Sequence, residues 1–481
     1  MSEIRGPIPD AVVVGAGPNG LAAAITLARA GRSVRVLERA AEPGGGARSG
    51  EVTLPGFVHD ICSAIHPFGR LSPFFREVAL ERHGLRWIEP PAAFAHPLDG
   101  GRAVLITRDV ETTAAALGRD RDAWRRLFGP LARSFEALTP DILGPFHIPL
   151  RPRRTLRLAW FGLHALQPAT WLVRRFRDEP ARAAFAGAAA HSILRLDEPI
   201  SGAAALVMVG SAHADGWPFP EGGSGRLTDT LVAELRALGG ELTTATPVET
   251  PDDLPRSRVA LFDTGPRTVV DVAGARLPER YRRRLRGYRY GPAVFKLDLA
   301  VDGPIPWQNE AVALAGTVHV GGTFEEIARS EADANAGRHS ERPFVLLAQP
   351  SLFDGTRAPE GKHVVWAYCH VPNRSTVDMT EPILRQIERF APGFRDRILA
   401  TAKTFPADLA AYNPNNVGGD QSGGRIDIRQ LFTRPVARLD PYSTPDPRLF
   451  LCSSSTPPGG GVHGMCGWHA AHSALRRLGA D

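Results

Sequence analysis

Lysine and cysteine are both scarce in this 481-residue sequence, and each scarcity excludes a class of protein. The 57 basic side chains include only three lysines, Lys296, Lys362 and Lys403, and the formal net charge of +6 is spread along the chain. A nucleic-acid-binding surface would gather its positive charge on one face. We therefore expect no nucleic-acid partner, and the arginine excess is more typical of coding bias.

The four cysteines are Cys62, Cys369, Cys452 and Cys466, and they form no C-x-x-C pair. Such spacing argues against a disulfide framework, a structural zinc site and a dithiol redox centre. We expect no bound metal and no disulfide-reductase chemistry.

Long apolar runs are missing as well. The chain opens with MSEIRGPIPD, which has no apolar segment of the kind that a signal peptide requires. The stretch most like a spanning helix, residues 156–173, is interrupted by Arg157, His164 and Pro168. We therefore expect a cytoplasmic protein.

The length and the composition indicate an ordinary globular protein with more than one lobe. A chain of 481 residues is too long for a single compact core. Its hydrophobic content of 43% and charged content of 22% are typical of soluble globular domains.

Residues 10–38 follow the pattern of a dinucleotide-binding unit. An apolar run over 11–14 has the length of a buried parallel strand and stops at the G-x-G-x-x-G spacing of GAGPNG, residues 15–20. A helical pattern follows, and a second strand is predicted over 34–37, closed by Glu38. The order strand, glycine turn, helix and strand favours a bound dinucleotide.

Each residue of this unit has a physical role if a dinucleotide binds. Gly15 makes the tight turn, Gly17 allows the backbone to approach the pyrophosphate, and Gly20 allows close packing of helix on strand. The helix presents unpaired N–H groups to the phosphates. Glu38 can accept hydrogen bonds from ribose hydroxyls.

A second glycine-rich turn, PGGGARS, covers residues 43–49. Three glycines let the main chain lie against a flat or anionic ligand, and Arg48 could reach a phosphate. The alternative is a mobile surface loop. The short distance from the first turn favours the ligand-facing interpretation.

The rest of the chain divides by pattern. We expect residues 1–75, 211–275 and 426–481 to form a discontinuous nucleotide-binding domain, residues 76–210 a helical cap, and residues 276–425 a substrate-domain sheet. The cap is predicted from the alanine-rich, mostly helical pattern after residue 72. The middle segment is assigned to the nucleotide-binding domain because the order strand, helix, strand returns there.

Residue alternation predicts the strands of the second lobe. Strands are expected at residues 294–299, 312–314, 344–348 and 363–368, with a helix over 383–390 packed on their sheet. The alternation favours an antiparallel sheet that forms the floor of the second lobe.

The final segment, residues 448–472, predicts a strand, a glycine-rich turn and a closing helix. A helix that begins near Gly464 would point its N–H groups at whatever lies in the turn. His463 could add a side-chain donor there, or it could simply be exposed.

The two glycine turns together with the C-terminal strand, turn and helix resemble the phytoene dehydrogenase-like branch of the flavin amine oxidase and phytoene desaturase superfamily. The resemblance covers nearly the whole chain and includes LPGFVHDICSAIHP, GPAVFKLDLAVDGPIPW and TPPGGGVHGMCGWHAA. It implies an α/β plus α+β fold, with a discontinuous Rossmann-type FAD-binding domain and a substrate domain of antiparallel sheet and helical cap. One departure is the short segment 249–257, where family members usually carry a β-hairpin.

The resemblance also implies where FAD would lie. Its diphosphate would rest on the two glycine turns, its adenosine ribose at Glu38, its adenine against the main chain of Val248, and its pyrimidine edge at the last helix. The predicted cofactor-binding residues are Gly15, Gly17, Pro18, Asn19, Gly20, Glu38, Arg39, Gly45, Gly46, Ala47, Arg48, Val248, His463, Gly464 and Met465.

Three residues are predicted to take part in catalysis. Lys296 lies on a predicted strand among apolar residues, where a lysine is costly unless it is paired or hydrated. The resemblance to flavin amine oxidases implies that it holds a water at the flavin N5, and the alternative is a lysine that reaches solvent at the sheet edge. Asp60 or His66 could serve as general base, or both could be structural.

These features predict an FAD-dependent oxidoreductase that transfers hydride between a lipophilic small molecule and the flavin, with C–C desaturation as the preferred reaction. The alternatives are an amine or alcohol oxidase that uses O2, and a redox-neutral isomerase or flavin scaffold protein. No second G-x-G-x-x-G domain supports a built-in NAD(P)H site.

Arginines beside tryptophans in residues 151–175 leave open a peripheral contact with a membrane surface. The favoured alternative is a cap helix with solvated arginines and core tryptophans.

Overall fold

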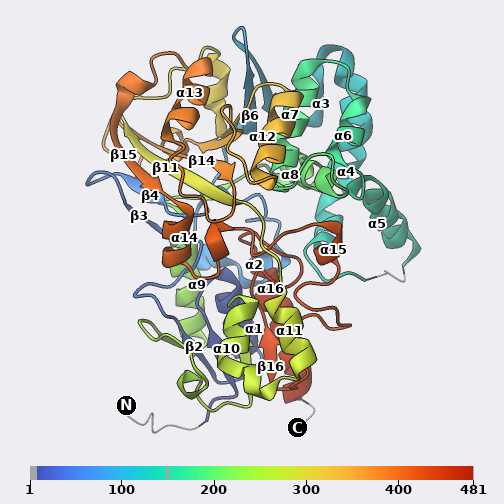
Figure 1. The fold of residues 1–481 in the computed structure, drawn as a ribbon, viewed down its shortest axis with the longest axis vertical. Coiled ribbons are helices and arrows are strands. Elements are labelled where there is room, and N and C mark those ends of the chain that lie inside the picture. The colour runs from blue at the N-terminus through green and yellow to red at the C-terminus, as the bar shows by residue number, and fades with distance from the viewer. Residues whose placement is uncertain (1–7, 148–150, 480–481) are drawn as a thin grey trace.

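The structure is a computed structural model that describes residues 8–147 and 151–479. Two lobes lie one above the other in Figure 1. The lower lobe holds a five-stranded parallel sheet, and the upper lobe holds a seven-stranded mixed sheet with most of the cap helices. This arrangement confirms the predicted fold class.

The parallel sheet gathers strands from the beginning, middle and end of the chain. Its order is β16–β10–β1–β2–β9, and every neighbouring pair is parallel. The central strand is fully buried, as expected for a sheet covered on both faces. The strands are β1 (Ala11–Val14), β2 (Val34–Leu37), β9 (Glu241–Thr243), β10 (Val259–Phe262) and β16 (Leu449–Leu451).

Helices cover both faces of this sheet. One face packs against α1 (Pro18–Arg29), α9 (Ser224–Ala237) and α16 (Met465–Leu478). The other packs against α10 (Pro266–Ala273) and α11 (Glu279–Arg286). Helix α16 begins at Met465, which agrees with the predicted helix start near Gly464.

Helices α1 and α16 approach each other closely at their N-terminal ends. A Cβ atom on Gly467 would lie 1.7 Å from the carbonyl oxygen of Asn19. Only glycine allows this approach, which brings the first and last segments of the lower lobe into direct contact.

The upper sheet has the order β15–β11–β14–β13–β12–β6–β7. All its pairs are antiparallel except β12–β6. The strands are β6 (Ala92–Leu98), β7 (Arg102–Ile106), β11 (Ala293–Val301), β12 (Ala315–Val320), β13 (Val345–Ala348), β14 (His363–Val371) and β15 (Ile398–Thr404).

Three details of this sheet differ from the prediction. Residues 92–106 were expected in the helical cap but form β6 and β7. The prediction was wrong because β6 is buried on both faces, so its sequence shows no alternation of apolar and polar residues. Residues 312–314 belong to a 3₁₀ turn, and the strand begins only at Ala315. The exposed edge strand β15 was not predicted.

Helices enclose the upper sheet on both sides. Its outer face packs against α13 (Thr380–Phe390). Its inner face packs against the cap, made of α4 (Arg121–Ile142), α7 (Glu179–Ala190), α8 (Ser201–Asp215) and α12 (Phe324–Asn335). The inner face is the one that reaches the candidate site.

Short elements complete the two lobes. They are β3 (Ser49–Glu51), β4 (Val58–Asp60), α2 (Pro73–Val78), β5 (Trp87–Ile88), α3 (Val110–Ala115), α6 (Ala169–Leu172), β8 (Phe219–Pro220), α14 (Pro406–Tyr412) and α15 (Ile428–Leu431).

Helix α5 (Pro152–Ala165) stands apart from the rest of the cap, and Ala165 is its only buried residue. Trp160 packs partly against the cap core, whereas Trp171 is exposed, so the expectation of core tryptophans holds for only one of the two. Within the described residues, no helix combines the length and the apolar character needed to cross a bilayer.

Candidate functional site

A cavity of about 640 Å³ lies between the two lobes and is lined by residues of both. We call its lower part the nucleotide end, which includes Gly15, Glu38 and Val248, and its upper part the sheet end, which includes Trp366 and Tyr368. The cavity is continuous from one end to the other, so a ligand at the first could touch a ligand at the second.

The nucleotide end contains most of the residues predicted to bind the cofactor. Those that line the cavity are Gly15, Gly17, Pro18, Asn19, Glu38, Arg39, Gly45, Gly46, Arg48 and Val248. Gly20 and Ala47 lie buried behind the two turns, and the Ala47 carbonyl accepts a hydrogen bond from Thr228.

The two glycine turns touch each other. Gly15 has φ +101° and Gly45 has φ +53°, both in the region that favours glycine. A Cβ atom on Gly45 would lie 3.0 Å from the Cα of Gly17. The turns therefore form one cradle of main chain, with no side chain between it and a ligand.

The cradle fits a diphosphate. The side-chain oxygens of Asn19 and Thr264 are buried without a partner in the described residues, and both residues line the cavity. No side chain is bonded at the N-cap residue Gly17, and Asp263 accepts the Gly20 N–H in the first turn of α1. The other main-chain N–H groups of this turn and the Thr264 hydroxyl can donate to an anionic ligand.

Glu38 and Arg48 are held in place beside this cradle. The Glu38 carboxylate accepts hydrogen bonds from the N–H groups of Ala16 at 2.8 Å and Ala40 at 2.9 Å. Arg48 lies 3.7 Å from Glu38 and 5.0 Å from the ring centre of Tyr412. Each carboxylate oxygen keeps a second lone pair, so Glu38 can still accept ribose hydroxyls.

Asp263 also lines the cavity and was not among the predicted site residues. Its carboxyl group accepts the Gly20 N–H at 2.8 Å, and a Cβ atom on Gly17 would lie 2.7 Å from it. Burial raises the pKa of Asp263 well above its usual value, and the charge of Glu38 adds to the rise. Burial therefore disfavours a negative charge on the carboxyl group beneath the cradle. The available signal was its position at the carboxyl end of β10, where ligands of such sheets bind.

The C-terminal turn meets the cavity earlier in the chain than predicted. Gly460, Gly461 and Val462 line the cavity, whereas His463, Gly464 and Met465 do not. The Met465 N–H is donated to Nδ1 of His463 at 3.0 Å. Burial lowers the pKa of His463 to about 4, so this histidine is a neutral helix cap and not an exposed residue.

His66 and Asp60 have different surroundings. His66 lines the cavity, and its Nε2 lies 2.9 Å from the hydroxyl of Ser224. Burial lowers its pKa to about 4 despite the attraction of Asp60. His66 is therefore neutral at pH 7.

Asp60 does not line the cavity. It pairs with Arg357 at 2.8 Å and accepts hydrogen bonds from Ser224 and Ser49. Burial opposes its ionisation, but Arg357 and these hydrogen bonds outweigh it and lower the pKa of Asp60. An ionised carboxylate with both oxygens occupied is suited to positioning its neighbours, not to accepting a proton.

Lys296 is buried in the interior strand β11, so the alternative of a lysine at the sheet edge is wrong. Its ammonium group pairs with Asp298 two residues along the same face. His59 lies 3.5 Å from that carboxylate, and the Trp366 ring centre is 5.9 Å from the ammonium. The burial cost of the lysine is thus offset by a partner.

The sheet end is formed by the inner face of the upper sheet together with cap residues. Register places Trp366 opposite Ala348, and Ala348 opposite Thr317. The lining residues contributed by the sheet are Thr317, Leu346, Trp366 and Tyr368, and those contributed by the cap and its loops are His191, Ile193, Met208 and Trp217. None of these was predicted, because pairing of distant strands brings them together.

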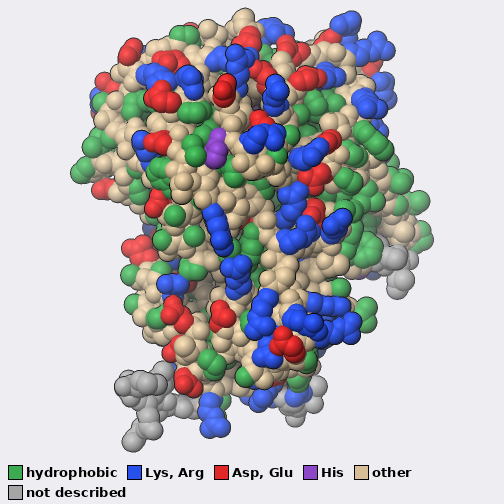
Figure 2. Space-filling view, viewed as in Figure 1, with side chains coloured by type: hydrophobic (Ala, Val, Ile, Leu, Met, Phe, Trp, Pro, Cys, Tyr) green, Lys and Arg blue, Asp and Glu red, His purple; other side chains and the backbone are tan. Residues whose placement is uncertain are grey.

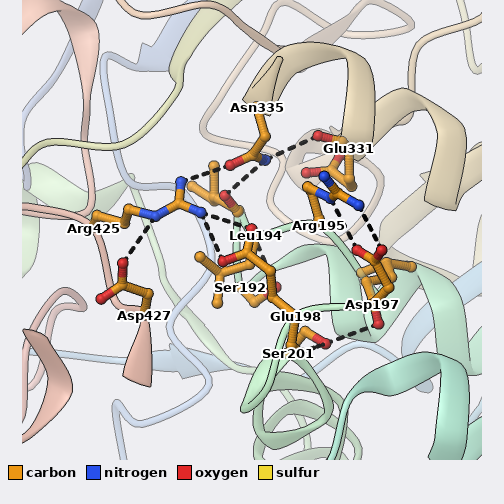
Figure 3. A network of polar contacts seen from close by, with 12 residues as sticks. Ser192, Leu194, Arg195, Asp197, Glu198, Ser201, Glu331, Asn335, Arg425 and Asp427 are labelled. Atoms are coloured by element: carbon orange, nitrogen blue, oxygen red, sulfur yellow. Dashed lines mark hydrogen bonds and ion pairs between the residues drawn. The ribbon is translucent and has the colours of Figure 1, made fainter. Parts of the chain in front are cut away.

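A polar network holds one wall of the sheet end (Figure 3). Arg425 donates hydrogen bonds to Glu198 at 2.7 Å and to Asn335 at 2.7 Å. Asn335 in turn donates to the carbonyl of Ile193 at 3.3 Å. Ile193 has φ +53°, which is rare for a β-branched residue, and it lines the cavity. This Arg425 network therefore fixes a strained loop, residues 191–198, against the cavity.

Comparison with known proteins agrees with this geometry. Residues 13–78 match the model of an NAD(P)-binding Rossmann-like domain. Hydroxyneurosporene desaturase of Cereibacter sphaeroides is 32% identical over 99% of both chains. The chain belongs to the phytoene dehydrogenase-like family. It is an oxidoreductase of the FAD-dependent desaturase and amine oxidase superfamily.

Other members of the superfamily align along most of their length. Phytoene dehydrogenase of Streptomyces griseus is 28% identical over 83% of this chain and 79% of its own. A rat protein named pyridine nucleotide-disulfide oxidoreductase domain-containing protein 2 is 28% identical over 98% and 94%. Putrescine oxidase has the same fold, with a TM-score of 0.63 and 17% identity over 98% and 99% of the two chains.

Proposed function

We propose that this phytoene dehydrogenase-like protein binds FAD and removes hydride from a lipophilic small molecule, with C–C desaturation as the reaction. The observation that supports the proposal is the continuous cavity, which joins the two glycine turns to an aromatic sheet face. Bound FAD would supply the hydride acceptor. The residues of the chain bind it, orient the substrate and exclude water.

The cofactor would lie along the nucleotide end. Gly15, Gly17 and Arg48 would hold its diphosphate, Glu38 its ribose, and Val248 its adenine. Main-chain groups of residues 460–462 would line the flavin, in place of the predicted residues 463–465. The positive end of the α1 dipole favours the negative charge of the diphosphate.

The sheet end suits a lipophilic substrate. Phe68, Met208, Trp217 and Leu346 line it and exclude water. Two relatives are named phytoene dehydrogenase and hydroxyneurosporene desaturase, and a third, 32% identical over 30% of this chain, is named as one subunit of a limonene dehydrogenase. These names support dehydrogenation of an isoprenoid-like molecule as the reaction class.

Lys296 and His66 would serve the chemistry in different ways. Lys296 does not line the cavity, and its ammonium, which is paired with Asp298, lies 5.9 Å from the ring centre of Trp366 and would position this lining residue. Neutral His66 can hold a proton or accept a hydrogen bond at its place in the lining. Asp60 would act through Ser224, which it shares with His66.

The second proposal is an oxidase of a C–N or C–O bond that uses O2. The putrescine oxidase fold and the buried Lys296 favour it. A redox-neutral isomerase or flavin scaffold is the third, and it predicts a flavin that no substrate reduces.

One experiment separates these proposals. Purified protein is reconstituted with FAD, mixed anaerobically with candidate terpenes, alcohols and amines, and followed by flavin absorbance. Bleaching by a terpene with slow reoxidation in air supports the desaturase, and bleaching by an amine or alcohol with fast reoxidation supports the oxidase. Protein that shows no flavin band after reconstitution would refute FAD binding and all three proposals.

Peripheral contact with an anionic membrane is proposed for the face around α5. Hydrophobic side chains gather there along the right edge of Figure 2. Leu156 and Leu163 are 72% and 69% exposed, and Trp171 is 57% exposed. Arg153 and Arg174 carry positive charge nearby, a combination that binds anionic lipid surfaces. Sedimentation with phosphatidylglycerol vesicles, but not with phosphatidylcholine vesicles, tests this contact.

A further inference from the structure

The sheet end of the cavity contains polar atoms that lack partners. Nε1 of Trp366 and Oγ1 of Thr317 are buried, and neither has a hydrogen-bond partner within the described part of the chain. Both residues line the cavity. A buried donor without a partner is destabilising, so such atoms in a binding cavity point to a ligand that completes them.

The two groups share one face of the sheet. Trp366 on β14 and Thr317 on β12 both lie opposite Ala348 of β13, which separates them by two strand spacings. Two spacings amount to about 10 Å between backbones. The long indole side chain spans part of this distance, so one small polar group of a ligand can lie between Trp366 and Thr317.

His191 adds a third polar group to the same end. Its Nε2 lies 3.0 Å from Nε2 of His319, so the two rings share one proton. Burial and the nearby His370 lower the pKa of His191 to about 3, and the pair is neutral at pH 7. The ring of His191 lines the cavity and keeps Nδ1 as a donor or an acceptor, depending on the tautomer.

No formal charge lines this end in the described structure. The charged residues of the cavity lining are Glu38, Arg39, Arg48, Glu249, Asp263 and Asp271. All of them belong to the lower lobe. Behind the sheet end, the Lys296 ammonium pairs with Asp298, and a carboxylate oxygen of Glu331 lies 2.8 Å from Nδ1 of His370. A substrate ammonium group would therefore find no free carboxylate here.

The kind of hydrogen-bonding group on Trp366 further limits the chemical class of the ligand. An indole N–H can only donate, so the ligand must offer a lone pair to Trp366. A protonated amine has no lone pair to offer. A carbonyl or hydroxyl oxygen has lone pairs and remains neutral.

Resting on the proposed function, we propose that the substrate is a lipophilic molecule with a neutral oxygen, carbonyl or hydroxyl, held by Trp366, Thr317 and His191. This polar subsite fixes which carbons of the substrate lie toward the nucleotide end. It favours a ketone, enone or alcohol over a pure hydrocarbon and over an amine.

Four probes of nearly equal size test the proposal: acetophenone, 1-phenylethanol, ethylbenzene and protonated 1-phenylethylamine. Their binding to the FAD-reconstituted protein is measured by calorimetry and by flavin difference spectra. One neutral hydrogen bond contributes about 0.5–1.5 kcal/mol, which corresponds to about 2- to 12-fold in affinity. Acetophenone and 1-phenylethanol should bind tighter than ethylbenzene by this factor, and the amine weakest.

Trp366→Phe removes the N–H and replaces the indole by a smaller aromatic ring. It should abolish the preference for acetophenone over ethylbenzene, and the ratio of the two affinities is the readout because a smaller side chain changes both affinities together. Thr317→Val should reduce the preference in the same way. The matched control is Trp307→Phe, because Trp307 donates to Gln349 on the outer face of the same sheet. This control should keep the full preference.

Three results would overturn the inference: equal binding of ethylbenzene and acetophenone, a preference that survives Trp366→Phe, or binding of none of the probes by flavin-loaded protein. Failure of the proposed function is a separate result, because it would appear as protein that takes up no flavin. The binding readout requires no turnover, so an inactive flavoprotein can still confirm or refute the subsite.

Discussion

The two ends of the cavity are built by different means. At the nucleotide end, main chain from two glycine turns forms the surface, and a few side chains such as Glu38 and Arg48 complete it. At the sheet end, the surface consists of side chains from β12, β13, β14 and the cap. Main-chain groups can hold a phosphate whatever the neighbouring side chains are. A binding surface made of side chains, in contrast, changes its chemistry with each substitution. The nucleotide end is therefore suited to a ligand that is the same in many proteins, and the sheet end to a ligand that differs from one protein to another.

Gly17→Asp should give the largest effect and should be confined to the nucleotide end. A Cβ atom at this position lies 2.7 Å from the carboxyl group of Asp263, and the added charge would face the diphosphate. We expect soluble protein that binds no flavin, measured by absorbance after reconstitution. Gly355→Asp is the control, because nothing lies within 4 Å of a Cβ atom there. A yellow Gly17→Asp protein would refute the assignment of this end.

Lys296→Met should affect the sheet end and leave flavin bound. Removing one partner of a buried ion pair costs about 3–5 kcal/mol, because Asp298 is left without compensation. Chemical denaturation should show this loss, and rapid mixing should show slower flavin reduction or reoxidation. Lys296→Met/Asp298→Asn should recover stability but not rate. Normal kinetics in both variants would make Lys296 a structural residue.

Acid should destabilise the folded protein through its buried histidines. Burial lowers the pKa of His66 and His463 to about 4, below the usual value of 6.5. The unfolded chain therefore binds more protons between pH 6.5 and pH 4, and stability falls as the pH falls through this window. Each such histidine costs up to about 2 kcal/mol between pH 6.5 and pH 5. Thermal unfolding between pH 7 and pH 5 measures the slope, and His66→Gln should make it shallower. A slope that His66→Gln leaves unchanged would show that His66 is not protonated on unfolding.

Arg425→Ala should give the smallest effect of these variants on stability. It should alter the sheet end and leave the nucleotide end unchanged. Loss of its bonds to Glu198 and Asn335 should lower the free energy of unfolding by about 1–2 kcal/mol and release the 191–198 loop. We expect unchanged flavin binding, weaker acetophenone binding and faster proteolysis of the loop. Arg195→Ala is the control, because Arg195 is half exposed and pairs with Asp197 (Figure 3). Equal proteolysis in both variants would contradict the role of the network.

The sequence was most informative where the signal is local. The parallel strands at 11–14 and 34–37, the glycine turn between them and the helix that begins at Met465 were all predicted from contiguous residues. Glycine at fixed positions reports a backbone requirement, and such a requirement needs no knowledge of distant neighbours. The burial of Lys296 was predicted for the same reason, from its apolar flanks on one strand.

Other features depended on contacts between distant segments. Strand β6 was mistaken for part of the cap because a strand buried on both faces shows no alternation. The C-terminal turn was predicted to meet the ligand at residues 463–465, and the fold places residues 460–462, not these three, in the lining of the cavity. Asp60 was expected as a possible base, and only the fold shows that Arg357 occupies it.

The sequence by itself determined the class of cofactor site, because that site is made of backbone turns whose requirements are written in consecutive residues. Tertiary structure alone decided the surface of the sheet end, because Thr317, Trp366 and His191 come from separate strands and a cap loop. Their meeting depends on strand order and register, which are set by the packing energy of the whole upper lobe and by no local pattern.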